Sequence, residues 1–119
     1  MTQEERQLLL KDLCARLPYR TKIHIIGEGG EEIDADLTTS TIDYFMSWTV
    51  RPYLRPMSSM TEEEQQKYYD LTHQEEDDIW GKCLFDKMVD FCNENHLDYR
   101  GLIEKRLALE ASEDMYKED

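Results

Sequence analysis

Apolar and polar residues alternate along much of the stretch 22–50, and this period of two constrains the fold more than any other feature of the sequence. Two short alternating runs flank a glycine-rich turn signal at 27–30, and a third run, in which Phe45 is the exception, covers 42–50. Successive side chains of a strand point to opposite faces. The pattern therefore predicts a three-stranded antiparallel meander over about 21–50, with one face on a core and the other in water.

Helical spacing before this region predicts a helix that covers the apolar face of the sheet. Thr2 and Glu5 have the spacing of a capping box, which satisfies backbone amides at a helix start, and Pro18 ends the helix. Asp12 is expected to lie away from its apolar face. That face is expected to carry Leu9, Leu10, Leu13, Cys14 and Leu17.

Three further helices are expected in the C-terminal half. A second capping box, at Thr61, starts one from about residue 62, and an apolar stripe predicts another from Ile79. Asp98 is expected to cap the last helix, which bears apolar residues from Leu102 to Leu109. The predicted class is therefore α+β, with the meander packed against an N-terminal helix and three C-terminal helices.

The length of 119 residues is typical of one domain. We predict a single α+β domain over 1–111 and a polar, flexible tail over 112–119. The aromatic residues Tyr68, Tyr69 and Trp80 could form a contact between two copies of the chain, because aromatic side chains are enriched at interfaces.

The net charge of -13 is unevenly distributed. Residues 1–60 carry seven basic and nine acidic side chains, whereas residues 61–119 carry seven basic and eighteen acidic ones. Such a field repels phosphate backbones, so it disfavours general nucleic-acid binding. It suits a soluble protein or one that meets a basic partner, and we expect that partner to be a protein.

The cysteines and the hydropathy pattern bear on the compartment. Cys14, Cys83 and Cys92 have neither the number nor the spacing of a disulfide framework or a zinc site, so we expect reduced thiols packed in a core and a cytoplasmic location. The uninterrupted apolar runs are about three residues long, whereas a membrane span needs about 20. No membrane partner is expected.

Motifs that carry catalytic chemistry or hold nucleotides and metals do not occur in the sequence. The glycines at 27–30 are flanked by glutamates that would repel a phosphate, so they indicate a turn. His24 is expected to pair with Asp34 or Asp36 across the hairpin rather than to bind a metal. We therefore expect no cofactor, no metal and no assigned catalytic residue.

The segment RPYLRPMSSMTEEE, residues 51–64, is the first of two candidate binding sites. Its two prolines interrupt a strand, and its threonine starts a helix, so the local interpretation is an extended connector. The alternative is a binding segment that uses Arg51, Tyr53 and Arg55.

The segment HLDYRG is the second candidate, because it gathers an imidazole, a carboxylate, a phenol and a guanidinium within five residues. A helix cap by Asp98 is the simpler interpretation. A recognition or catalytic site formed by His96, Asp98, Tyr99 and Arg100 is the alternative.

Three segments, LLLKDLCARLPY, RPYLRPMSSMTEEE and HLDYRGLIEKRLALEA, make the chain similar to a family. It resembles small proteins of unassigned activity from gut Bacteroidales genomes, often encoded in phages or other mobile elements. The resemblance implies an intracellular bacterial or phage accessory protein. It also implies glycine at the position of Arg106, so that Arg106 should leave the last helix more regular. The stretch 22–48 is where the family is expected to vary most.

We therefore predict a small, acidic, non-enzymatic accessory protein that binds another protein. An enzyme with an unrecognised site near His96–Arg100 is one alternative. The other is a nucleic-acid-associated module with a basic and aromatic patch in the N-terminal half. That patch would consist of Arg16, Tyr19, Arg20, Lys22, Arg51, Tyr53 and Arg55.

Overall fold

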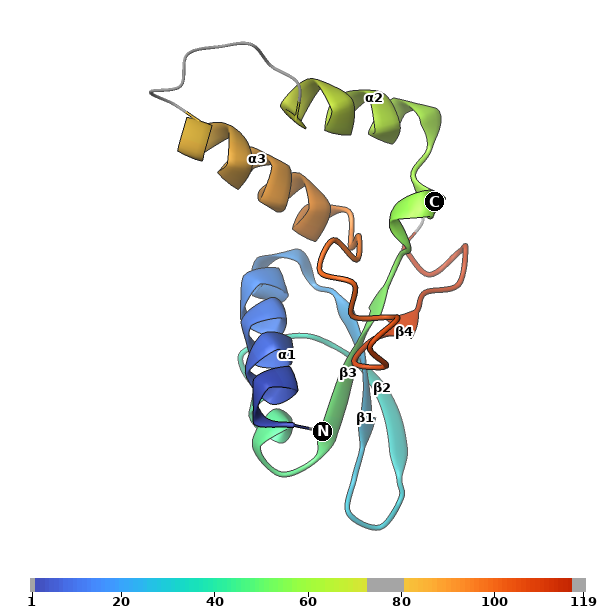
Figure 1. The fold of residues 1–119 in the computed structure, drawn as a ribbon. Coiled ribbons are helices and arrows are strands. Elements are labelled where there is room, and N and C mark those ends of the chain that lie inside the picture. Colours follow the sequence, from blue (N-terminus) through green and yellow to red (C-terminus); the bar gives the residue numbers. More distant parts are fainter. Residues whose placement is uncertain (1, 73–80, 117–119) are drawn as a thin grey trace.

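The computed structural model describes residues 2–72 and 81–116, and for residues 81–85 it describes the backbone alone. Within these residues, a mixed four-stranded sheet packs against one helix, and two further helices pair beyond one end of the sheet (Figure 1). The helices are α1 (Gln3–Arg16), α2 (Glu62–Thr72) and α3 (Gly81–Glu94), and the strands are β1 (Lys22–Ile26), β2 (Glu32–Asp36), β3 (Thr49–Leu54) and β4 (Leu109–Glu110). The molecule is elongated, with extents of 52 × 34 × 25 Å.

The strand order β2-β1-β3-β4 confirms the α+β class but corrects the meander. The predicted hairpin is present, because β1 and β2 pair antiparallel around a turn in which Gly30 has φ +86°. The third strand lies beside β1 rather than beside β2, and β4 adds a short parallel pairing to β3. The α+β prediction is thus right in outline, and the three-stranded antiparallel meander is wrong.

The third strand also begins later than the sequence predicts, because residues Ile42–Met46 form a 3-10 helix. Three residues per turn place every third side chain on one face. Ile42, Phe45 and Trp48 have this spacing, and all three pack in the core cluster, with Phe45 buried. Phe45, the one residue that broke the predicted alternation, is therefore the buried residue of this 3-10 helix.

The buried face of α1 contains two charged residues. Leu9 and Leu13 are wholly buried as predicted, but so are Asp12 and Arg16, whereas Cys14 is exposed. The expected position of Asp12 away from the core is therefore wrong, and so is the burial expected for Cys14. Cys92 is buried as predicted, and the side chain of Cys83 lies outside the described residues.

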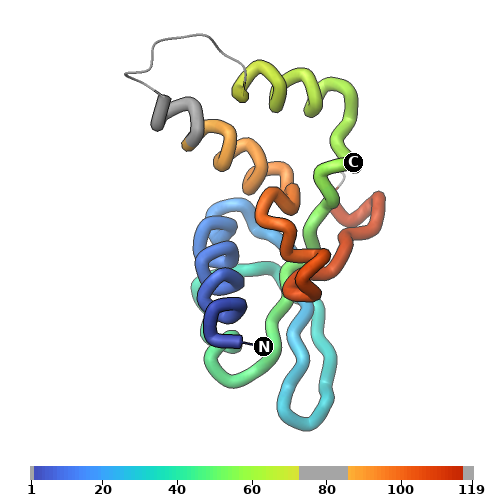
Figure 2. Tube along the Cα trace, in the orientation of Figure 1, coloured from blue at the N-terminus to red at the C-terminus, as the bar shows by residue number. Residues whose placement is uncertain are grey.

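The C-terminal half contains two of the three expected helices. The Thr61 capping box at the start of α2 is confirmed, because the backbone amide of Thr61 donates to Glu64 Oε1 and the amide of Glu64 donates to Thr61 Oγ1. Residues 101–108 form turns and bends instead of the last helix, and Figure 2 shows this orange-red segment next to α1 and over the upper part of the sheet. Leu102 in this segment is wholly buried in the main core.

The prediction of a last helix is wrong, because the chain forms one capped turn and then ends it. Asp98 does cap that turn, accepting hydrogen bonds from the amides of Leu102 (2.8 Å) and Ile103 (3.0 Å). The amide of Leu107 then donates back to the carbonyl of Leu102, a pattern that ends helices. Arg106 has φ +63° there, a conformation that favours glycine, so it does not make a helix more regular.

Replacing Arg106 with glycine is expected to stabilise the fold by about 0.5–1 kcal/mol, because glycine adopts this left-handed conformation without strain. Urea unfolding monitored by circular dichroism measures the change. Lys105→Gly is the matched control, since Lys105 is also exposed but does not have a positive φ. Equal loss of stability in both variants would contradict this account of Arg106.

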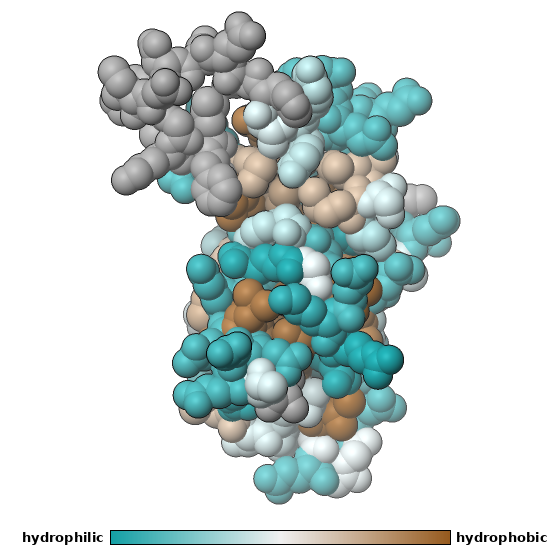
Figure 3. Space-filling model, in the orientation of Figure 1, coloured by the Kyte–Doolittle hydropathy of each residue, from teal (hydrophilic) through white to brown (hydrophobic). Residues whose placement is uncertain are grey.

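Two hydrophobic clusters hold the described residues together. The larger joins α1, the sheet and the 102–108 segment, and the smaller joins α3 to Met57, Met60 and Tyr68. Tyr69, from the expected contact between copies, is 55% exposed, and Trp80 lies outside the described residues. In the face shown in Figure 3, hydrophilic residues cover most of α1 and its surroundings. None of the helices in the described ranges has the length and apolar character of a membrane span.

Candidate binding site

The two segments that the sequence singled out lie side by side. The amide of Arg55 donates to the carbonyl of His96 (2.7 Å), and the amide of Asp98 donates to the carbonyl of Arg55 (2.9 Å). These bonds form a one-residue parallel bridge between Arg55 and Leu97. The backbone thus joins the connector to the HLDYRG segment, but the side chains point to different parts of the molecule.

Arg100 and Tyr99 belong to an ion cluster with Asp12 and Arg16 of α1. Asp12 accepts from Arg16 Nε (2.8 Å) with one carboxylate oxygen and from Arg100 Nε (3.1 Å) with the other. Arg100 also donates to the hydroxyl of Tyr99, and the guanidinium of Arg16 lies 5.4 Å from the centre of the Tyr99 ring. These contacts attach the HLDYRG segment to α1, which is a structural role.

His96 contacts Tyr116 and Thr21, the residue that precedes β1. Its ring stacks on Tyr116, with 3.7 Å between the ring centres, and its Nδ1 lies 3.0 Å from Thr21 Oγ1. Burial, together with the nearby positive charge of Arg16, lowers the pKa of His96 to about 4. His96 is therefore neutral near pH 7. With Asp98 engaged as a cap, the four predicted side chains do not converge on one cavity.

Tyr53 lies on the exposed face of the sheet with His24. The hydroxyl of Tyr53 donates to Asp34 Oδ1 (2.8 Å), and burial and this carboxylate raise the pKa of Tyr53 to about 12. His24 Nδ1 lies 2.7 Å from the same oxygen, and its Nε2 lies 3.1 Å from Glu32. The Asp34 hydrogen bond raises the pKa of His24. The predicted cross-strand pair is confirmed, and both ring nitrogens of His24 are occupied.

The basic patch proposed for a nucleic-acid-associated module is smaller than expected. Arg16 is wholly buried, so it cannot belong to a surface patch. Arg55 is paired with a carboxylate, and Arg51 Nε is buried without a hydrogen-bond partner among the described residues. This leaves the alternative without two of its expected cations.

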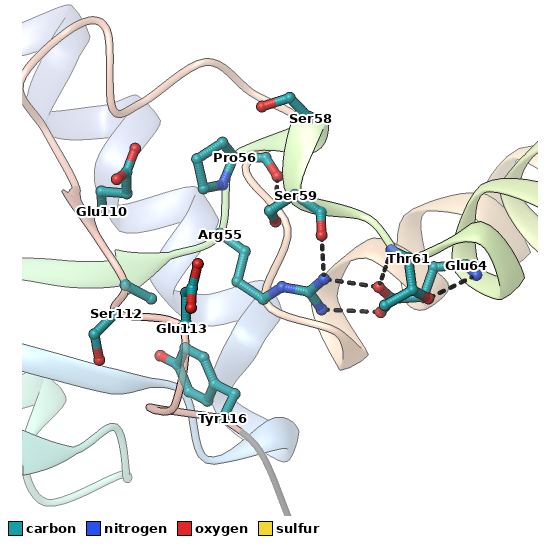
Figure 4. A pocket seen from close by; sticks show the side chains of 11 residues that line it. Arg55, Pro56, Ser58, Ser59, Thr61, Glu64, Glu110, Ser112, Glu113 and Tyr116 are labelled. Carbon is teal, nitrogen blue, oxygen red and sulfur yellow. Dashed lines mark hydrogen bonds and ion pairs between the residues drawn. The ribbon is translucent and has the colours of Figure 1, made fainter.

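A pocket of about 860 Å³ lies beside Arg55, between two walls of the chain (Figure 4). One wall is the part of the 51–64 segment beyond β3, since residues 51–54 continue the strand through Pro52 instead of forming a connector. The other wall is Glu110 of β4 and the segment that follows it. The lining residues are Arg55, Pro56, Ser58, Ser59, Thr61, Glu64, Glu110, Ala111, Ser112, Glu113 and Tyr116.

Arg55 fixes the first wall and is neutralised there. Its two terminal nitrogens bind the two carboxylate oxygens of Glu64, at 2.9 and 2.7 Å, and donate to the carbonyls of Ser59 and Asn95. The hydrogen bonds from Arg55 lower the pKa of Glu64 to about 2. A planar, two-bonded pair of this kind is strong and directional. Arg55 therefore brings no unpaired positive charge to the pocket.

The second wall is held by backbone pairing and by Tyr116. The amide of Ala111 donates to the carbonyl of Leu54. The hydroxyl of Tyr116 donates to the carbonyl of Tyr53 (2.6 Å) and accepts from the amide of Lys22 (2.8 Å), so it bridges β3 and β1. Within the expected tail, Tyr116 is half-buried and bonded to the sheet, residues 112–114 are exposed, and 117–119 lie outside the described residues.

The second wall carries the carboxylates of the pocket that have no basic partner. Glu110 and Glu113 are exposed, and neither forms an ion pair with another residue in the part of the chain that the structure describes. Arg55 and Glu64 cancel each other, so the lining has a net negative charge. The pocket can accept hydrogen bonds from a cationic group.

Sequence reasoning found Arg55 but not the rest of the pocket. Glu64 belongs to the predicted capping box, and Glu110 and Glu113 were not singled out. The glutamates and Tyr116 come near Arg55 only because β4 pairs with β3, which no local pattern announces. No protein-family model, curated protein sequence or solved structure matches this chain.

Proposed function

We propose that this chain is a small, non-enzymatic protein-binding module. Its pocket between 55–64 and 110–116 receives a basic segment of a partner protein. The observation that carries the proposal is the charge of the lining: Arg55 is neutralised by Glu64, which leaves Glu110 and Glu113 facing the open volume. In this proposal the protein acts inside a bacterial cell, as its resemblance to mobile-element proteins of Bacteroidales implies.

The size and chemistry of the pocket fit a short peptide segment. A volume of about 860 Å³ lies within the range of ordinary ligand pockets. A lysine or arginine side chain that enters it meets two carboxylates, and the net charge of -13 attracts such a partner from a distance. Charge complementarity of this kind raises the association rate and selects the partner.

The same side chains support binding rather than catalysis. A nucleophile needs a base within hydrogen-bond reach. In the pocket, Ser59 Oγ donates to the carbonyl of Pro56 (2.6 Å), and the Tyr116 hydroxyl donates to a backbone carbonyl. Burial raises the pKa of Tyr116, so its phenol stays protonated. These hydroxyl groups are engaged with the backbone of the protein itself.

The double variant Glu110→Gln/Glu113→Gln tests the proposal. Panning a random peptide library against the wild-type protein should enrich peptides rich in lysine and arginine. The double variant should bind these peptides about tenfold more weakly by fluorescence anisotropy, which corresponds to about 1.4 kcal/mol. The physical reason is the loss of both carboxylates that face the pocket.

The matched control is Glu94→Gln/Glu104→Gln. Both glutamates are exposed and outside the pocket lining, so this variant loses the same charge elsewhere. It should keep the wild-type affinity. Equal weakening by both double variants would show that bulk charge, not the pocket, attracts the peptides, and enrichment of neutral or acidic peptides would overturn the proposal.

A further inference from the structure

Strand β2 is an edge of the sheet that no other described segment covers. It stands first in the order β2-β1-β3-β4, and four of its five residues are exposed. The opposite edge is different, because β4 and the Arg55–Leu97 bridge both pair with β3. An uncovered edge offers backbone hydrogen-bonding groups to an additional strand.

The register identifies the backbone groups that face outward. The amide of Leu37 donates to Thr21, and the amide of Gly27 donates to Glu31, so the odd-numbered residues of β2 bond to β1. Its even-numbered residues therefore point their amides and carbonyls away from the sheet. At Asp36 the carbonyl is already taken by the hydroxyl of Thr41. Within the described residues, the outward groups without a hydrogen-bond partner are the amides of Glu32, Asp34 and Asp36 and the carbonyls of Glu32 and Asp34.

The side chains of β2 determine which strand could pair there. Natural edges are protected by proline, charged side chains or a bulge; β2 pairs with β1 in continuous register and contains no proline, and its charged side chains are all acidic. Its wet face carries only carboxylates: the side chains of Glu32, Asp34 and Asp36 are 65%, 66% and 50% exposed. Like charges on facing strands repel, so these carboxylates oppose pairing between two copies of β2.

The other face of β2 is apolar at its edge. Ile33 is 51% exposed although it lies opposite the buried Ile25. A strand added beside β2 would place alternate side chains on this face, next to Ile33, and the remaining ones next to the carboxylates. Lys22 and His24 of β1 already contact these carboxylates, so the wet face carries three carboxylates against two basic side chains.

We propose that β2 is a docking edge for an extended segment of a partner protein in which lysine or arginine alternates with apolar residues. The segment adds a fifth strand to the sheet, and backbone hydrogen bonds to the open groups of β2 supply its register. Its basic side chains contact the carboxylates of Glu32, Asp34 and Asp36, and its apolar side chains cover Ile33. This edge is separate from the pocket beside Arg55.

Amide hydrogen exchange measured by NMR tests this with a defined probe, the capped peptide Lys-Val-Lys-Val-Lys. Saturating peptide should slow the exchange of the Glu32, Asp34 and Asp36 amides about tenfold, because these amides gain a hydrogen-bond partner. The amides of Ile33 and Ala35 should change little, since they already bond to β1. Unchanged exchange at the three even-numbered amides would overturn the proposal.

Two further peptides separate strand addition from charge attraction. The peptide Glu-Val-Glu-Val-Glu should give no protection. A lysine peptide methylated at the backbone nitrogens on its β2-facing side keeps its charge but cannot donate, and it should protect the edge at least several-fold less. Equal protection by the methylated and unmethylated lysine peptides would contradict a paired strand.

Two protein variants complete the test. Glu32→Gln/Asp36→Asn leaves Asp34 and its contacts with His24 and Tyr53 in place, and it should weaken binding of the lysine peptide about tenfold. Unchanged affinity would overturn the role of these carboxylates. The pocket variant Glu110→Gln/Glu113→Gln should bind the peptide at β2 as the wild type does, so failure at the pocket and failure at the edge give different results.

Discussion

Replacing Asp12 with alanine is expected to destabilise the protein by about 3–5 kcal/mol, because it leaves Arg16 buried without its counter-ion. Asp12 and Arg16 are both wholly buried, and Asp12 also accepts from Arg100. One Arg16 nitrogen, Nη1, already has no hydrogen-bond partner among the described residues, so the loss of Asp12 would isolate the cation further. A loss of this size is a large part of the usual stability of a domain.

Urea unfolding of Asp12→Ala, followed by circular dichroism, gives the measurement. Glu4→Ala is the control in the same helix, because Glu4 is exposed, and it should change stability by less than about 0.5 kcal/mol. The double variant Asp12→Ala/Arg16→Met should recover part of the loss, since an apolar side chain of similar length needs no partner. A loss below about 1 kcal/mol in Asp12→Ala would show that Arg16 reaches water.

The second large effect is expected at Leu102, where alanine should cost about 2–5 kcal/mol by leaving a cavity in the main core. Leu102 is wholly buried and belongs to the cluster that includes Leu9, Leu13 and Leu54. It lies in the segment of turns that replaces the expected last helix, so the variant asks whether that segment is part of the core.

Thermal and urea unfolding of Leu102→Ala should be compared with Leu10→Ala. Leu10 is 38% exposed on α1, and alanine is a good helix former, so the same chemical change there should cost less than about 1 kcal/mol. Similar small effects at both positions would mean that the 101–108 segment can separate from the sheet without unfolding it. A much larger loss at Leu102 confirms that the segment completes the core.

The sequence predicted the elements whose signals are local. The hairpin of β1 and β2 follows from alternation and a glycine turn, and the starts of α1 and α2 follow from capping boxes at Thr2 and Thr61. A pair between His24 and Asp34 or Asp36 was expected from the hairpin, and the structure has Asp34. Each of these depends on residues that are close along the chain, so a pattern of a few residues suffices.

The errors arise where distant residues decide the structure. Alternation in 42–50 fits a strand and also contains a spacing of three, and only the core that receives Phe45 selects the 3-10 helix. Likewise, Asp98 caps a turn that Leu107 ends, because the chain must return to place β4 beside β3. The burial of Asp12 depends on Arg100, which is 88 positions away.

The sequence predicted some residues of the candidate site but not the contacts between them. Arg55 was named from sequence, but its contact with Glu64 was not, although both belong to the segment 51–64. The HLDYRG residues attracted attention for their chemistry, yet Asp98 and Arg100 are used to hold the segment in place. Mixed polar groups close in sequence thus indicated a structural junction rather than a reaction centre.

The hydroxyl bridge of Tyr116 has a consequence for how the protein forms during synthesis. Lys22 leaves the ribosome early, but the bond that links its amide to β3 comes from a side chain 94 positions later. Contacts of such long sequence separation form slowly and late. A nascent chain that stops short of residue 116 can pair β1 with β3 but lacks the bridge at one end of that pairing, so translation must pass that point before the bridge forms.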